Sequence, residues 1–202
     1  MNIKIIVAGL ASILGGLLIF ISWVWQGYLS ITSDNHVILF DEHLYSSEIN
    51  NYLLFVSTLA LLLGMKLFNH HLNKYLNRMI YWKTGYYFSL LSMTIFLIAL
   101  FVFFLKNLVD LQIINNLIIP ITAFSHIILH FSAFLIGMSL LGRYTIFRIS
   151  GIFFIIQFFV VLVILTGFLP TNPFFVSLAI GSWFGFAWIF LGVGAIQLFR
   201  NK

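Results

Sequence analysis

The chain has 202 residues, of which 62% are hydrophobic and only 7% are charged. Soluble domains carry roughly a quarter charged residues, so this composition excludes a soluble globular protein. The chain has no cysteine, which excludes disulfides, thiolate metal sites and cysteine nucleophiles. The formal net charge of +5 does not indicate nucleic acid, because nearly all the basic residues gather on one side of the predicted membrane bundle.

Apolar runs of about twenty residues recur along the chain, which is the length that a helix needs to cross about 30 Å of hydrocarbon. The connections between these runs are too short to hold a soluble domain. We therefore predict an all-α, polytopic integral membrane protein in which residues 1–202 form a single bundle. The six predicted transmembrane helices cover residues 3–25, 52–68, 85–105, 117–141, 146–168 and 173–199.

The charged residues divide between the two sides of this predicted bundle. Nine of the ten basic residues fall at the chain ends or in the second and fourth connections, and only Lys106 falls on the other side. All five acidic residues fall in the first and third connections. Because basic residues are enriched on the cytoplasmic side, we expect a multi-pass protein of the plasma membrane with both termini in the cytoplasm.

The second connection, residues 68–82, predicts a short amphipathic helix between the second and third spans. Its apolar residues fall on one helical face, and its basic and amide residues fall on another. Such a helix lies among the lipid headgroups, where basic side chains meet anionic lipid. The residues expected at this lipid interface are Lys74, Arg78, Lys83 and Trp82. A specific protein partner at the same face is the alternative.

Small residues recur at every fourth position in the first and sixth predicted spans. They are Ala8, Ser12 and Gly16 in the first span, and Ser177, Gly181 and Gly185 in the sixth. Faces of this kind let two helix backbones approach closely inside a membrane. We therefore expect these two spans to pack against neighbouring helices through these faces.

The fourth predicted span contains the stretch AFSHIILHFSAF, with His126 and His130 one helical turn apart on one face. They are the only ionisable side chains near the middle of any predicted span. Ionisable groups are costly in hydrocarbon and usually have a partner or a function there. Gln157, near the middle of the fifth span, is the polar neighbour that we expect beside them.

Two roles for His126 and His130 need no cofactor. In the first, neutral imidazoles form hydrogen bonds between helices and only stabilise the bundle. In the second, the pair and Gln157 handle a small molecule, a lipid or protons, because imidazole titrates near neutrality. A third role is a structural subunit of a complex with other membrane proteins. The lipid bilayer is the partner common to all three.

A divalent metal at His126 and His130 is a further alternative, and it would make the protein a membrane enzyme or a redox subunit. A third ligand would have to come from the first connection, which carries Asp41, Glu42 and His43. The HxxxH spacing is similar to that in membrane hydrolases of the alkaline ceramidase and adiponectin-receptor type. The chain departs from them because two further spans follow the pair. Haem fits less well, because its two axial ligands normally come from facing helices.

The charge distribution predicts which connections an impermeant thiol reagent reaches in intact cells. Cysteines placed at Asn35 and Asn107 should react, because both positions lie on the predicted outer side, whereas a cysteine at Asn77 should not. The native chain contains no cysteine, so each labelling signal comes from the introduced residue alone. Labelling at Asn77 in intact cells would overturn the predicted orientation.

Overall fold

The computed structural model describes residues 3–32, 48–72, 79–105, 114–142, 144–166 and 172–200. The elements in these ranges are α1 (Ile3–Thr32), α2 (Glu48–Leu72), α3 (Met79–Phe104), the π-helical turn η3 (Ile114–Ile118), α5 (Ile119–Leu140), α6 (Thr145–Leu165) and α7 (Pro173–Arg200). Six of these helices are long and apolar enough to cross a membrane. The prediction of an all-helical, multi-pass membrane protein is therefore confirmed.

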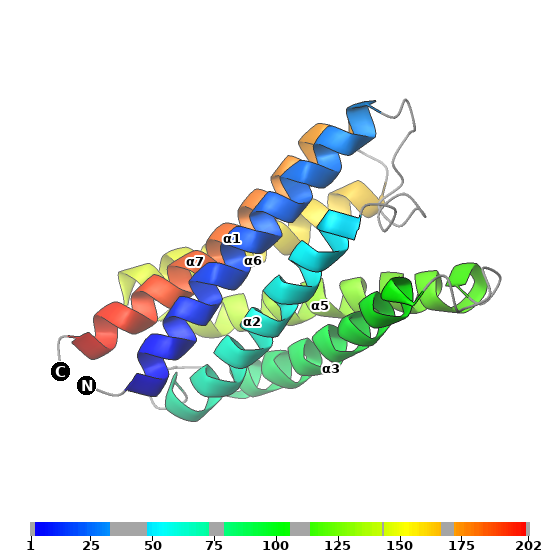
Figure 1. Ribbon diagram of the computed structural model, residues 1–202. Helices are drawn as coiled ribbons and strands as arrows, with labels where there is room; N and C mark the ends of the chain where they lie inside the picture. The colour runs from blue at the N-terminus through cyan, green and yellow to red at the C-terminus, as the bar shows by residue number, and fades with distance from the viewer. Residues whose placement is uncertain are drawn as a thin grey trace.

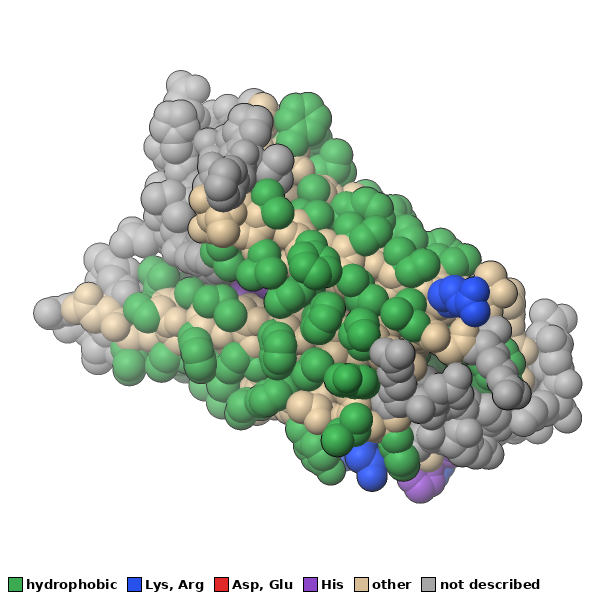
Figure 2. Space-filling model, turned by 180° about the vertical axis from the view of Figure 1, so that it is seen from behind, with side chains coloured by type: hydrophobic (Ala, Val, Ile, Leu, Met, Phe, Trp, Pro, Cys, Tyr) green, Lys and Arg blue, Asp and Glu red, His purple; other side chains and the backbone are tan. Residues whose placement is uncertain are grey.

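The six long helices form a ring in chain order. Each helix packs against its neighbours along the chain. The last helix, α7, closes the ring by packing against α1, to which it runs antiparallel (Figure 1). The start of α1 and the end of α7 consequently lie together at one end of the bundle (Figure 1). We call this end of the bundle the basic end, because the helices carry four basic residues there: Lys4, Lys66, Lys83 and Arg148. We call the opposite end the distal end. Much of the described surface between them is hydrophobic (Figure 2).

The interfacial helix predicted in the second connection is not confirmed by the structure. The stretch expected to form a separate interfacial helix begins as the end of α2 and finishes as the start of α3, while residues 73–78 lie outside the described ranges. Phe68 and Trp82 are fully buried in the bundle, whereas Met79 and Ile80 are exposed.

Of the four residues expected at the lipid interface, only Trp82 and Lys83 lie in the described ranges. Lys83 is exposed at the basic end, as a lipid contact requires. Trp82 instead donates a hydrogen bond from Nε1 to Asn69 Oδ1 over 3.1 Å, which joins α3 to α2. Lys74 and Arg78 lie outside the described ranges, and their expected lipid contacts stay predictions.

Glycine contacts bring the backbones of α1 and α7 together. A Cβ atom added to Gly16 would lie 2.6 Å from the Gly185 carbonyl oxygen, and one added to Gly185 would lie 2.7 Å from the Gly16 oxygen. Gly9 and Gly192 form a second such pair nearer the basic end, with corresponding distances of 2.8 and 2.5 Å. Van der Waals contact of this kind holds helices together in lipid, where no hydrophobic effect drives their association. Gly16 and Gly185 belong to the small-residue faces predicted from the sequence.

Other neighbouring helices join through glycine and serine. Between α5 and α6, a Cβ atom on either Gly137 or Gly151 would lie 2.7 Å from the carbonyl oxygen of the other. Between α3 and α5, the hydroxyls of Ser89 and Ser132 share a hydrogen bond of 2.8 Å. These contacts place α5, which carries the histidine pair, against both of its neighbours in the ring.

The glycine pairs predict a steric cost for added side chains. Gly16→Val and Gly185→Val should each lower the free energy of unfolding by about 1 to 3 kcal/mol, because each new side chain meets the backbone of the facing helix. Unfolding of the purified protein in detergent measures this cost. Leu14→Val is the control, because Leu14 is 49% exposed on the same helix and should lose little. Equal stabilities for all three variants would contradict the close α1–α7 contact.

Candidate functional site

His126 and His130 both project from α5 toward the centre of the ring. Pro120 lies in the first turn of α5, directly after the π-helical turn η3. From there the helix runs inward from the distal end and reaches His130, which is only 6% exposed. His126 lies one turn nearer the distal end and is partly buried. The centroids of the two rings are 6.4 Å apart.

Gln157 of α6 is the hydrogen-bond partner of His130. Gln157 Nε2 donates to His130 Nδ1 over 2.5 Å, and both side chains are buried. In this orientation of the amide Nδ1 is the acceptor, and the ring proton of neutral His130 is assigned to Nε2; the reverse orientation would place that proton on Nδ1. Gln157 Oε1 is also buried and has no hydrogen-bond partner in the described part of the chain. The neighbour expected from the sequence is thus present, with one oxygen unsatisfied.

Neutral His126 carries its ring proton on Nδ1. Its Nδ1–H donates to the Thr122 carbonyl oxygen over 2.9 Å, and a carbonyl can only accept. The lone pair of neutral His126 is therefore assigned to Nε2. The edge of the Phe96 ring packs against the imidazole with centroids 4.7 Å apart, which limits its rotation. With these assignments, Nε2 is a donor in His130 and an acceptor in His126.

A small cavity lies beside both imidazoles. It has a volume of about 30 Å³ and is lined from α1, α2, α3, α5 and α7, with Thr58 as a further polar wall residue. A cavity of this size holds one or two water molecules. Binding sites for drug-sized molecules are about 300 to 1,000 Å³. The centre of the ring therefore suits an occupant the size of water.

A polar cluster lies between this cavity and the distal end. The Ser22 hydroxyl of α1 donates to Asn50 Oδ1 of α2 over 2.5 Å, and Asn50 Nδ2 donates to Gln26 Oε1 over 2.9 Å. All three side chains are buried, and together with His126 they line a second cavity of about 10 Å³. Trp23 and Leu54 also line both cavities. Polar groups consequently lead from the distal part of the bundle to the histidine pair.

Sequence reasoning missed this distal cluster. Gln26 and Asn50 fall just outside the predicted spans, at 3–25 and 52–68. In the structure, α1 and α2 both extend past those limits and bring the two side chains together. Ser22 and Gln26 are one helical turn apart, and this spacing is the sequence pattern that indicates a shared polar face.

The described residues contain no group of three or more His, Cys, Asp or Glu side chains that could hold a metal ion. The pair offers two nitrogens, and catalytic zinc sites usually have three protein ligands. The expected sources of a third ligand, Asp41, Glu42 and His43, lie outside the described ranges. Since both histidines project from α5, they cannot occupy opposite faces of one haem. Metal binding stays a prediction for experiment.

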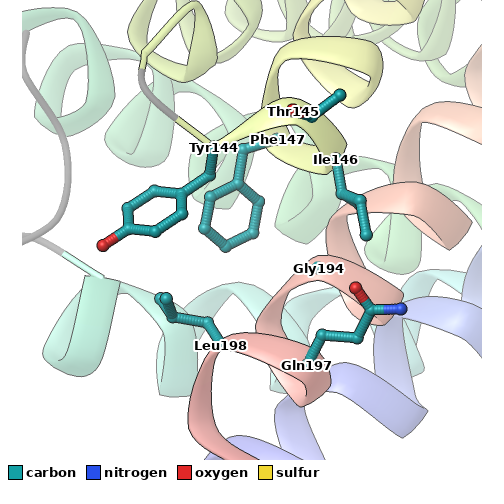
Figure 3. Close-up of a pocket in the computed structure, with 7 residues that line it drawn as sticks. All are labelled: Tyr144, Thr145, Ile146, Phe147, Gly194, Gln197 and Leu198. Atoms are coloured by element: carbon teal, nitrogen blue, oxygen red, sulfur yellow. The ribbon is translucent and has the colours of Figure 1, made fainter. Parts of the chain in front are cut away.

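A larger cavity, of about 430 Å³, lies at the basic end between the first turn of α6 and the last turns of α7 (Figure 3). Tyr144 and Phe147 project from the α6 side toward Leu198 of α7 (Figure 3). Tyr144 carries the only titratable side chain among its described lining residues. This cavity therefore has no pair of neighbouring titratable side chains among its described lining residues. The histidine site has such a pair and is the stronger candidate for chemistry.

Comparisons of the chain with protein-family models, with curated proteins and with solved structures found no match. The functional inference therefore depends on the chemistry and geometry of the chain itself.

Metal content separates the metal-dependent alternative from the others. We expect the purified full chain to carry no stoichiometric zinc or iron, because two imidazoles alone rarely retain a divalent ion. Elemental analysis by mass spectrometry measures this. About one metal ion per chain, lost in His126→Gln and in His130→Gln but retained in His36→Gln, would contradict the expectation and favour a metal-dependent enzyme.

Proposed function

We propose that this multi-pass membrane protein handles protons through His126, His130 and Gln157 and is not an enzyme. The observation that carries the proposal is the opposite arrangement of the two neutral rings beside a water-sized cavity. His130 offers Nε2–H, His126 offers the Nε2 lone pair, and the ring centroids are 6.4 Å apart. With centroids this far apart the two rings cannot hydrogen-bond directly, so proton transfer between them would need water in the cavity as a bridge.

Gln157 supports both protonation states of His130. In the present arrangement its amide nitrogen donates to the Nδ1 lone pair. When Nδ1 takes up a proton, a half-turn of the same amide brings Oε1 into position to accept from Nδ1–H. Oε1 has no other hydrogen-bond partner in the described ranges, so this half-turn breaks no bond that Oε1 makes there. A side chain with one donor and one acceptor is suited to a group that changes its protonation state.

The distal polar cluster supports a route for protons to the pair. Ser22, Gln26 and Asn50 line the cavity that reaches His126, and His126 also lines the cavity that reaches His130. Imidazole can accept a proton at one nitrogen and release a proton from the other. Protons would therefore enter from the distal end and reach the centre of the ring through water and the two imidazoles.

The size of the central cavity favours protons over the other ligands considered. At about 30 Å³ it is roughly a tenth of the smallest usual binding pocket, so a lipid or a larger solute would require the helices to separate. A proton carried by water requires no such movement. Proton handling is therefore the member of the proposed class that the geometry supports best.

Energetics argue against a purely structural role. An interhelical hydrogen bond in a membrane stabilises the protein by about 0.6 kcal/mol. A buried polar atom without a partner costs about 1 to 3 kcal/mol. Burying Gln157 with one bonded and one unsatisfied atom therefore has a net cost. Two apolar side chains at these positions would stabilise the bundle better, so the polar pair is better explained by function.

The charged ends support an orientation for this route. The described residues Lys4, Lys66, Lys83 and Arg148 lie at one end. By the positive-inside bias this end is cytoplasmic in a plasma membrane, and the distal end faces outward. The protons would then enter from the outer side. A structural subunit of a larger membrane complex is the alternative function, favoured if no proton movement is found.

Proton flux into vesicles tests the proposal. The purified chain is reconstituted in liposomes that contain a pH-sensitive dye, and a potassium gradient with valinomycin supplies the driving force. We expect flux above that of protein-free vesicles and a fall of about tenfold or more in His130→Gln and Gln157→Leu, because each variant removes a proton-accepting or adaptable group.

His36→Gln is the control, because it makes the same chemical change in a connection between spans, and its flux should equal that of the native chain. Native flux no greater than that of protein-free vesicles would contradict the proposal. Unchanged flux in His130→Gln and Gln157→Leu would contradict it equally. Either result, with only a small loss of thermal stability in the variants, would indicate the structural role.

A further inference from the structure

We propose that Phe154, Phe184 and Trp188 form an aromatic barrier that separates the histidine site from the basic end. The inference rests on the proposed proton handling, because it concerns the path that protons take beyond His130. The two small cavities lead from the distal polar cluster to the histidine pair. The three aromatic side chains lie on the other side of the site, where they control the second half of the path.

The barrier residues extend from the histidine site toward the basic end. Phe184 lines the central cavity, and its ring meets the His130 ring edge to face with centroids 5.9 Å apart. Trp188 follows Phe184 by one turn on α7, which ends at the basic end (Figure 1). Phe154 precedes Gln157 by nearly one turn on α6, which begins at the same end. The rings therefore stand directly between the site and the basic end.

The three rings of the barrier pack against one another. The ring centroids of Phe154 and Trp188 are 5.1 Å apart, and those of Phe184 lie 6.2 Å from each of the other two. The exposed fractions are 0% for Phe154, 1% for Trp188 and 2% for Phe184. In an interior packed this closely, one ring cannot turn aside unless its neighbours also move. The barrier is therefore closed in this conformation.

The indole nitrogen of Trp188 indicates that the barrier opens. Its Nε1–H is buried and has no hydrogen-bond partner in the described ranges. Most buried donors in proteins are paired, so an unsatisfied one calls for an explanation. A water molecule that enters from the basic end when the rings separate would accept this hydrogen bond. The indole would then stabilise the open conformation, which an apolar ring at the same position cannot do.

The interior beyond Trp188 is largely apolar. Five buried side chains there are at most 3% exposed: Ile136, Leu140, Phe147, Leu191 and Ala195. Two serine hydroxyls on this side already donate to backbone carbonyls, Ser139 to Ile136 and Ser150 to Ala187. Apolar constrictions in membrane proteins exclude water and so stop the passage of ions. Protons therefore reach the basic end only when the rings separate and water enters.

Proton flux in the liposome assay tests the barrier. Trp188→Ala should raise the flux about fivefold or more above that of the native chain, because water can then enter beside Phe184. Trp188→Phe keeps an aromatic ring in the barrier and should not raise the flux. Trp183→Ala is the matched control, because it removes the same side chain from the same helix. Trp183 is only partly buried and packs against Phe153, outside the barrier, so this flux should equal the native value.

The double variant Trp188→Ala, His130→Gln separates passage through the site from a general leak. Its flux should lose the increase, because protons must still pass His130. An increase that persists in the double variant would show a leak and overturn the barrier. The same holds if Trp188→Ala leaves the flux unchanged, or if Trp183→Ala raises it equally. Trp188→Leu replaces the alanine variant if the melting temperature shows that the latter fails to fold.

Hydrogen exchange of the Trp188 indole N–H tests the barrier without any proton flux. In nitrogen NMR spectra of tryptophan-labelled protein, Trp188→Phe assigns the signal. We expect exchange at least about tenfold slower than for Trp25, which is 38% exposed. Equal exchange rates together with native proton flux would overturn the barrier alone. Absence of flux in the native chain and in all barrier variants would overturn both proposals.

Discussion

The close approach of α1 and α7 determines how the rest of the bundle is arranged. Gly16 and Gly185 bring the two backbones into contact, and this contact closes the ring of six helices. With the ring closed, Trp23 of α1 and Phe184 of α7 line the central cavity across from α5. The enclosure that surrounds the histidine pair therefore depends on residues that lack a side chain, at positions some distance from the pair itself.

A second constraint is that polar groups inside a membrane must find partners within the protein. Several serines find such a partner within their own helix. The hydroxyls of Ser125, Ser132 and Ser139 each donate to the backbone carbonyl three residues earlier. The site around His130 meets the constraint differently, through a side chain from another helix and with Gln157 Oε1 unsatisfied. Ser12 Oγ and Trp188 Nε1 are also buried without a partner in the described ranges, so what distinguishes the site around His130 is its pairing of a titratable ring with an amide that can donate or accept.

Sequence reasoning reached the features that depend on one helix at a time. The number of spans follows from hydrophobic length, and the inward direction of His126 and His130 follows from their spacing. It also identified Gln157, because few polar residues lie at membrane depth. The features that it missed need several helices in their final positions: the cluster of Ser22, Gln26 and Asn50, and the burial of Trp82. The hydrophobic periodicity and composition of one span carry no information about which other helix packs against it.

The central claim is that the two neutral imidazoles of α5 hold opposite tautomers. Nitrogen NMR spectra of histidine-labelled protein test it directly, because protonated and unprotonated ring nitrogens have well-separated shifts, and the His126→Gln and His130→Gln variants assign the signals. The account predicts a proton on Nδ1 in His126 and on Nε2 in His130. The same tautomer in both rings would remove the donor and acceptor pair and contradict the account.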